Sequence, residues 1–213
     1  EHDPGTVDAA YRRLYEEVRV VGAKAEGILP DASFHQHGKQ LYNGGYGLAF
    51  ANDVGRFVAY AWGTPWQIPP EKMDILDLYL LEGQQWMVHG NVFDYSAVGR
   101  EITRKGKVAV PNDWRVGPIS PAGPAYSLGS VVTMLSELPV PRRDEYAAFA
   151  RRLHADAPPF TGHKHFWWSD YAAHRGNGYL ASVKMLSSRM VNAELVNDEG
   201  KKSHHLSDGV NLL

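Results

Sequence analysis

The periodicity of apolar residues changes near Pro158 and Pro159, and this change most constrains what the chain can fold into. Before it, apolar residues recur every three or four positions, which is typical of amphipathic helices. Beyond it, short alternating or β-rich runs are separated by glycines, which favours strands and turns. The order predicts an α+β chain, with a helical domain over residues 1–157 and the beginning of a separate antiparallel sheet domain over residues 158–213.

Five helices and three strands are expected from these patterns. The helices cover residues 6–24, 48–62, 69–80, 127–138 and 142–156, and the strands cover residues 166–168, 179–185 and 190–195. Two consecutive prolines at the third helix suit the first turn of a helix, where no backbone donor is needed. Residues 105–126 contain four prolines and are expected to form a loop.

Composition excludes several classes of function. The 213 residues carry a formal net charge of −2, which gives no basic excess of the kind typical of proteins that bind nucleic acid. No apolar run reaches the roughly 18–20 residues that span a bilayer, and we expect no membrane partner. There is no cysteine, which excludes disulfides and thiolate metal sites. No nucleotide or redox motif is found, so no cofactor is expected.

Three segments hold residue types suited to chemistry. His37 and Tyr46 lie in a glycine-rich stretch, where backbone can pass close to a ligand. Arg100 and Arg104 are four apart, so on a helix they would share one face and could clamp an anion. Residues 188–200 form an acidic run that contains Asn and Glu side chains. The structural alternatives are a core histidine, a solvated arginine pair and an ordinary hairpin.

Closely spaced histidines raise a metal-dependent hydrolase or lyase as an alternative. Imidazole pairs can bind zinc, but neither cysteine nor an HExxH motif accompanies them, and we expect no metal site. The pairs are His35 with His37, His163 with His165, and His204 with His205.

An ordered set of short motifs resembles polysaccharide lyase family 8, the hyaluronate, chondroitin AC and xanthan lyases. Tyr46 lies nine residues after His37, and Arg100 lies 54 residues after Tyr46, as in that family. The matching stretches are residues 33–38, 45–47, 99–104 and 166–209. The family fold is a helical (α/α) toroid followed by antiparallel β-sandwich domains, which agrees with the break near residue 158.

The resemblance implies a catalytic histidine and tyrosine, two active-site arginines, a supporting glutamate and a substrate-contacting asparagine. In that order they are His37, Tyr46, Arg100, Arg104, Glu194 and Asn197. Arg100 and Glu194 belong with the catalytic pair, whereas Arg104 and Asn197 are assigned to substrate binding. Glu199 competes with Glu194 for the supporting role.

The implied reaction is β-elimination on a uronic-acid-containing polysaccharide, giving a 4,5-unsaturated uronate. A phenol with its usual pKa of about 10 is a poor base at neutral pH, but a cation such as Arg100 favours the phenolate. Tyr46 would then be both base and acid, with His37 assisting. If the proton and the leaving oxygen lie on opposite faces of the sugar, His37 would be the base and Tyr46 the acid.

The family also uses an Asn and an aromatic patch that precede the histidine, and this chain starts too late to include them. We therefore expect a trimmed or excerpted chain whose partners are an acidic polysaccharide and the remainder of a longer protein. A second hypothesis is a non-catalytic fragment that holds acidic glycan. Polymer size and the resemblance imply an extracellular or periplasmic location.

Overall fold

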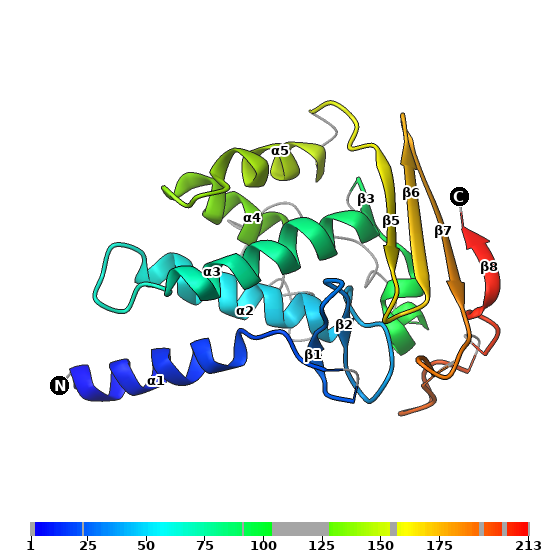
Figure 1. Ribbon diagram of the computed structural model, residues 1–213, viewed down its shortest axis with the longest axis horizontal. Helices are drawn as coiled ribbons and strands as arrows, with labels where there is room; N and C mark the ends of the chain where they lie inside the picture. The colour runs from blue at the N-terminus through cyan, green and yellow to red at the C-terminus, as the bar shows by residue number, and fades with distance from the viewer. Residues whose placement is uncertain are drawn as a thin grey trace.

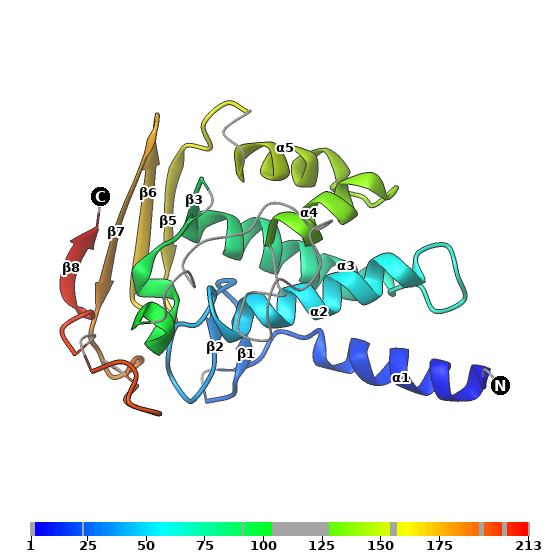
Figure 2. The ribbon, with the colours of Figure 1, turned by 180° about the vertical axis from the view of Figure 1, so that it is seen from behind.

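A computed structural model describes residues 3–22, 24–90, 92–103, 128–153, 157–191, 194–201 and 204–212. Helices gather on one side of a four-stranded antiparallel sheet, and α1 extends away from that sheet (Figure 1). The view from behind shows the same two layers (Figure 2). Helices precede the antiparallel sheet in the chain, so the predicted α+β class is confirmed.

The described helices are α1 (Pro4–Glu17), α2 (Tyr46–Ala61), α3 (Pro70–Asp77), α4 (Leu128–Glu137) and α5 (Arg143–Leu153). α3 continues as a π-helix, Leu78–Gly83, and a 3₁₀-helix, Gln84–Met87. Two further 3₁₀-helices cover Tyr95–Ala97 and Gly99–Thr103. No described helix is both long and apolar enough to cross a bilayer.

Local capping explains where α1 starts, and a tertiary pairing explains why α1 is shorter than predicted. Asp3 caps it by accepting the Gly5 N–H at 3.0 Å, and Pro4 occupies the first turn. The helix was expected to reach residue 24 but ends at Glu17. The chain then turns so that Val20 forms a parallel bridge with Ile28. This tertiary pairing overrides the apolar periodicity that continues beyond residue 17.

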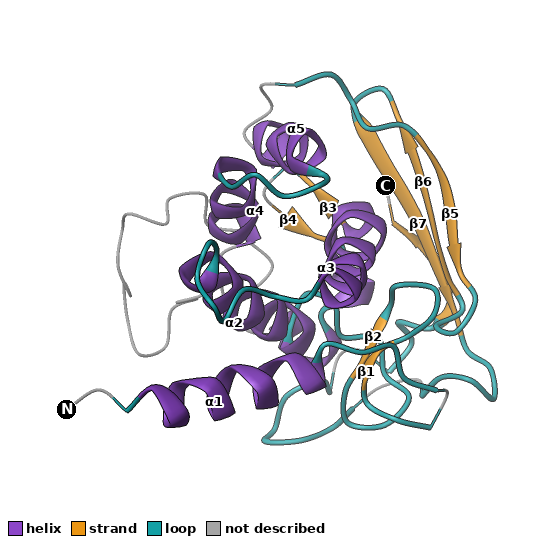
Figure 3. Cartoon of the chain, turned by 60° about the vertical axis from the view of Figure 1, so that its left-hand side comes forward, coloured by secondary structure: helices purple, strands orange, loops and turns teal. Residues whose placement is uncertain are grey.

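α2 packs closely on α4 because a glycine lets the backbones approach. A Cβ atom at Gly55 would lie 1.9 Å from a methyl group of Val131, which leaves no room for a larger residue. Leu48, Val54 and Val58 on α2 are buried in the same core. α2 and α4 lie side by side in Figure 3.

The strands in the described part of the chain form three antiparallel sheets. Two are short hairpins, made by β1 (Gly27–Ile28) with β2 (Phe34–His35), and by β3 (Val88–His89) with β4 (Val92–Phe93). The third has the order β5-β6-β7-β8, with bounds Gly162–Phe166, Tyr171–Gly176, Tyr179–Met185 and Asp208–Leu212. The expected strand at residues 179–185 is therefore confirmed.

Two strand predictions were wrong. Trp167 and Trp168 lie in the turn between β5 and β6, because Phe166 pairs with Tyr171 and closes the hairpin there. The described part of residues 190–195 lies in no strand. The N–H of Val191 instead bonds the carbonyl of Lys39 at 2.9 Å, which ties this segment to the loop after β2.

The sheet packs on the helical layer through apolar and polar contacts. Phe166 and Tyr171 are fully buried and belong to the same core as the helices. A buried polar chain crosses the boundary, in which Ser169 Oγ lies 2.9 Å from His35 Nε2 and 2.7 Å from Ser33 Oγ. These contacts join the turn after β5 with residues at β2, so the four-stranded sheet is tied to the helical part of the chain. The division into two domains at residue 157 stays a prediction.

Candidate active site

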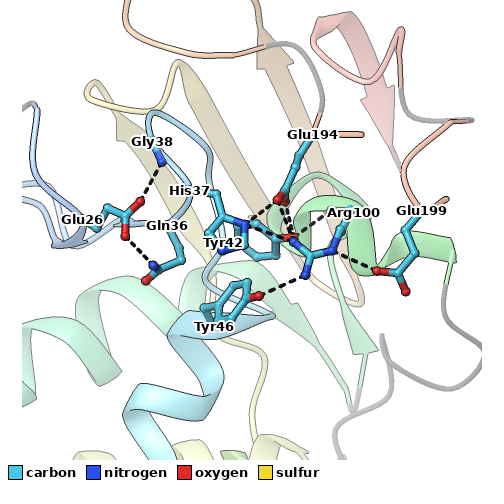
Figure 4. A network of polar contacts seen from close by, with 9 residues as sticks. All are labelled: Glu26, Gln36, His37, Gly38, Tyr42, Tyr46, Arg100, Glu194 and Glu199. Carbon is cyan, nitrogen blue, oxygen red and sulfur yellow. Dashed lines mark hydrogen bonds and ion pairs between the residues drawn. The ribbon is translucent and has the colours of Figure 1, made fainter. Parts of the chain in front are cut away.

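His37 lies in a tight loop that follows β2. Its backbone has φ of +56° and that of Gly38 has φ of +81°, so two successive residues are left-handed. Glu26 accepts the Gly38 N–H at 2.9 Å and also a hydrogen bond from the Gln36 side chain. The loop thereby presents the His37 imidazole, whose side chain is 37% exposed, toward the network drawn in Figure 4.

Tyr46 is the first residue of α2, and its ring lies beside that of His37. The two ring centroids are 4.8 Å apart with an interplanar angle of 54°. The ring of Tyr42 approaches Tyr46 edge-on at 5.1 Å. Three aromatic side chains from one short stretch therefore meet at the start of α2.

Arg100 lies at the centre of the network, and each of its three side-chain nitrogens donates a hydrogen bond to a different side chain. Its Nε donates to Glu199 Oε2 at 2.9 Å, its Nη1 to Glu194 Oε1 at 2.7 Å, and its Nη2 to Tyr46 Oη at 3.0 Å. The side chain is only 5% exposed. Burial would lower its pKa, but the hydrogen bonds with Glu194, Tyr46 and Glu199 outweigh burial and raise it.

Glu194 connects Arg100 with the histidine and a second tyrosine. Its Oε1 makes a short contact with His37 Nδ1, and its Oε2 accepts a hydrogen bond from Tyr42 Oη at 2.8 Å. Burial raises the pKa of Glu194, but bonds from Arg100, His37 and Tyr42 lower it further than burial raises it. The carboxylate is therefore ionised at neutral pH and can accept a hydrogen bond from His37 Nδ1–H, while Arg100 Nη1 lies 3.1 Å from the same ring nitrogen.

A proton on His37 Nδ1 determines what the other ring nitrogen can do. In the neutral ring, Nδ1–H donates to Glu194 and Nε2 keeps a lone pair that can accept a proton. In the imidazolium, Nε2–H becomes a donor as well. Glu194 therefore supports both protonation states in one orientation.

The structure brings together four of the six predicted side chains: His37, Tyr46, Arg100 and Glu194. Glu194 contacts both Arg100 and His37, which favours it over Glu199 for the supporting position. Their chemical roles stay predictions, because contacts alone do not establish a reaction.

Two predicted residues are not placed in this network. Asn197 is exposed and has φ of +55°, so it forms part of a turn beyond Glu194. Arg104 lies outside the described residues. Residues Gly99–Thr103 form a 3₁₀-helix and not the α-helix on which Arg100 and Arg104 would share a face. A 3₁₀-helix has three residues per turn, so positions four apart do not share a face as they do in an α-helix.

Tyr42 is the member of the network that sequence reasoning missed. Its ring is fully buried, and its phenol contacts both Arg100 and Glu194. The sequence offered one signal, a second tyrosine four residues before Tyr46. Nothing local distinguishes the two, because the difference depends on Glu194, which is 152 residues away from Tyr42.

The paired histidines have separate partners. His35 Nε2 contacts Ser169, whereas His37 Nδ1 contacts Glu194. Burial, with smaller contributions from Lys184 and Lys39, lowers the pKa of His35 to about 4, so its ring is neutral. Within the described residues, no group of three or more His, Asp or Glu side chains is arranged to hold a metal ion.

Gly99→Ala is expected to destabilise the fold by about 2–4 kcal/mol, which combines left-handed strain with overpacking. Gly99 has φ of +55°, and an added Cβ would lie 2.2 Å from the Tyr42 ring. Gly63→Ala is the matched control, since Gly63 has φ of +75° with nothing within 4 Å. It should cost about 1 kcal/mol. If urea denaturation shows that both variants lose the same free energy of unfolding, the Tyr42 ring can move aside to admit the added Cβ.

Comparisons with known proteins identify the family of the chain. Residues 1–114 match the model of the polysaccharide lyase family 8 N-terminal α-helical domain, and residues 161–213 match that of the family 8 super-sandwich domain. A chondroitinase-AC from Pedobacter heparinus is 26% identical over 97% of this chain and 28% of its own length. The family 8 protein HylA of Enterococcus faecalis is 25% identical over 88% of this chain and 16% of its own.

Solved structures share the fold. A chondroitinase AC lyase superposes with a TM-score of 0.80 at 24% identity, covering 98% of this chain and 29% of that one. A Paenibacillus xanthan lyase gives 0.80 at 20% identity, covering 99% of this chain and 22% of that one. The present chain thus spans less than a third of the length of these relatives. Because the helical family model covers more than half of its residues, the chain belongs to polysaccharide lyase family 8.

Proposed function

We propose that this protein cleaves a uronic-acid-containing polysaccharide by β-elimination and leaves a 4,5-unsaturated uronate. The observation that carries the proposal is the hydrogen bond from Arg100 to the phenol of Tyr46, next to the His37–Glu194 pair. A cation on a phenol favours the phenolate, which is a base. A histidine whose Nδ1 is held by a carboxylate keeps its Nε2 in one position, where Nε2 can accept or donate a proton.

The elimination removes the proton on C5 of the uronate and expels the oxygen on C4. The C5 proton is weakly acidic because the neighbouring carboxylate is already charged. Donors on that carboxylate stabilise the enolate-like transition state, as an oxyanion hole does. The imidazolium of His37 can supply such a donor through Nε2, because Glu194 holds its Nδ1.

Tyr46 can complete both proton transfers if the proton and the leaving group lie on one face of the sugar. The phenolate takes the C5 proton, and the resulting phenol protonates the departing O4. Arg100 stabilises the charge on the oxygen before this transfer. With the opposite geometry, neutral His37 would take the proton and Tyr46 would protonate O4.

The names of relatives support an acidic polymer as substrate. One relative is a chondroitinase-AC, and a structural neighbour, the Streptomyces coelicolor chondroitin AC lyase, is in complex with chondroitin sulphate. We further propose that the whole protein includes more chain than these residues. A polymer of this size would place the enzyme outside the cell or in the periplasm.

Tyr46→Phe tests the function directly. The protein is mixed with hyaluronan, chondroitin, xanthan and alginate, and ultraviolet absorbance follows the new C4–C5 double bond. We expect absorbance to rise on at least one polymer and the rate to fall by about 10²–10⁴-fold in Tyr46→Phe, since one group performs the proton transfers. Tyr60→Phe is the control, because Tyr60 lies on the same helix, is 61% exposed and contacts Phe57.

Two outcomes would count against the proposal. A flat trace on every polymer, with a folded protein by circular dichroism, would exclude lyase activity of this chain. Binding of a polymer without absorbance change would then favour the non-catalytic acidic-glycan fragment. Equal rates for Tyr46→Phe and wild type would remove Tyr46 from the reaction.

A further inference from the structure

We propose that Tyr42 is a positioning residue that keeps the Nη2 of Arg100 available for Tyr46. This inference rests on the proposed function, in which Arg100 stabilises charge on the Tyr46 oxygen. Tyr42 would act through Glu194 and Arg100, without touching substrate. Glu194 connects the two residues, because its carboxylate is shared among several donors.

The phenol of Tyr42 forms hydrogen bonds both with the backbone of Arg100 and with the side chain of Glu194. Its Oη accepts the backbone N–H of Arg100 at 3.1 Å and donates to Glu194 Oε2 at 2.8 Å. The Nη1 of Arg100 also lies 3.4 Å from this oxygen. One hydroxyl therefore fixes the backbone that carries Arg100 and the carboxylate that pairs with its side chain.

Arginine and a carboxylate commonly pair through two parallel N–H···O bonds. Here only Oε1 of Glu194 accepts a hydrogen bond from Arg100 Nη1, because Oε2 accepts the hydroxyl of Tyr42. Nη2 of Arg100 consequently donates to Tyr46 Oη. If the Tyr42 hydroxyl were absent, the Glu194 carboxylate could rotate about its Cγ–Cδ bond and accept hydrogen bonds from Nη1 and Nη2 together. Tyr46 would then lose its cationic donor.

Tyr42 is itself unsuited to be the acid or base. It is fully buried, and an added Cβ at Gly45 or Gly99 would lie 2.6 Å or 2.2 Å from its ring, so it is enclosed by backbone. Burial first, and then the hydrogen bond to Glu194, raise the pKa of Tyr42. The hydroxyl therefore keeps its proton and remains a donor to Glu194 throughout a reaction at neutral pH.

Tyr42→Phe tests this role because it preserves the ring and removes only the hydroxyl. We expect kcat to fall by about 10- to 100-fold, the effect of one hydrogen bond to a charged group, with KM nearly unchanged. The acid limb of the pH–kcat profile should move to higher pH, because the Tyr46 oxygen loses the hydrogen bond from the Arg100 guanidinium. The Tyr42→Phe/Tyr46→Phe double variant should lose no more than Tyr46→Phe alone, because Tyr42 acts through Tyr46.

Tyr15→Phe is the matched structural control. Tyr15 is also buried, and its phenol donates a single hydrogen bond to the carbonyl of Trp66 at 2.8 Å, outside the network. This variant should lose stability but keep the wild-type pH–kcat profile. An unshifted profile in Tyr42→Phe, or additive losses in the double variant, would overturn the positioning role.

A crystal structure of Tyr42→Phe gives a readout that does not depend on activity. We expect Glu194 to pair with both Nη atoms of Arg100 and the Arg100–Tyr46 bond to be lost. An unchanged network would overturn the inference even if the wild type cuts a polymer. The expected rearrangement in a protein that cuts no polymer would support the inference on geometry and reject only the proposed function.

Discussion

Arg100→Met is expected to lower the free energy of unfolding by about 3–5 kcal/mol, the usual cost of removing one partner from a buried ion pair. Arg100 is 5% exposed and lies between Glu194, which is 9% exposed, and Glu199, which is 20% exposed. Without the guanidinium, both carboxylates lose a cationic hydrogen-bond donor in a site that is largely buried. The same change removes the donor to Tyr46, so lyase activity should fall at least about 100-fold.

Arg13→Met provides the control for this prediction. Arg13 also bridges two glutamates, Glu16 at 2.7 Å and Glu17 at 2.6 Å, but its side chain is 70% exposed. Exposed pairs contribute little, so the free energy of unfolding should be nearly unchanged. Urea denaturation of both variants at pH 7 makes the comparison. Similar small effects in the two would show that water solvates the Arg100 network.

Lys184→Met is expected to stabilise the protein by about 3 kcal/mol at pH 7. Lys184 is 1% exposed on β7, opposite Tyr171 on β6. Burial, opposed only in part by Asp94, lowers its pKa from the usual 10.5 to about 8. That difference corresponds to about 3 kcal/mol of cost for holding the charged form. An apolar residue of similar length removes the cost, as with other buried charges.

The sign of the pH dependence follows from this lowered pKa. Between pH 8 and 10.5 the unfolded chain binds more protons at Lys184 than the folded chain does. The free energy of unfolding of the wild type should therefore rise with pH in that window, and Lys184→Met should lack this contribution. The difference between wild type and variant should be largest below pH 8 and vanish above pH 10.5.

Asp94 keeps its own hydrogen bonds in the Lys184→Met variant. It accepts the Ser96 N–H at 2.7 Å and the Tyr171 hydroxyl at 3.0 Å, so its charge is not left unsolvated. Lys201→Met is the control, because Lys201 is 67% exposed and pairs with Asp198. A Lys184→Met protein less stable than wild type at pH 7 would show that Asp94 requires the ammonium.

Secondary structure was predicted best where apolar periodicity is long. The helices expected at residues 48–62, 127–138 and 142–156 correspond to α2, α4 and α5, with ends shifted by up to three residues. α3 begins one residue after the predicted start, then changes to a π-helix and a 3₁₀-helix. In each case the pattern reflects one buried helix face, which the local sequence encodes.

Predictions failed where a distant segment competes with local pattern. The pairing of Val20 with Ile28 ended α1 early, and the bond from Val191 to Lys39 kept residues near 191 out of a strand. Ile28 lies eight residues after Val20, and Lys39 lies 152 residues before Val191, so neither partner is among the positions three or four apart that set helical periodicity. A short apolar run can serve either a strand or a loop, and tertiary contacts decide between them.

The sequence by itself determined the helix-then-sheet order and, through its spaced motifs, the identity of His37, Tyr46, Arg100 and Glu194 as candidates. Only the tertiary structure decided how they connect. The His37–Glu194 contact spans 157 residues and the Tyr42–Glu194 bond spans 152. Helix periodicity depends on neighbours three or four residues away, whereas the sharing of one carboxylate among Arg100, His37 and Tyr42 depends on folding that brings remote segments together. For that reason the role of Tyr42 emerged from the structure.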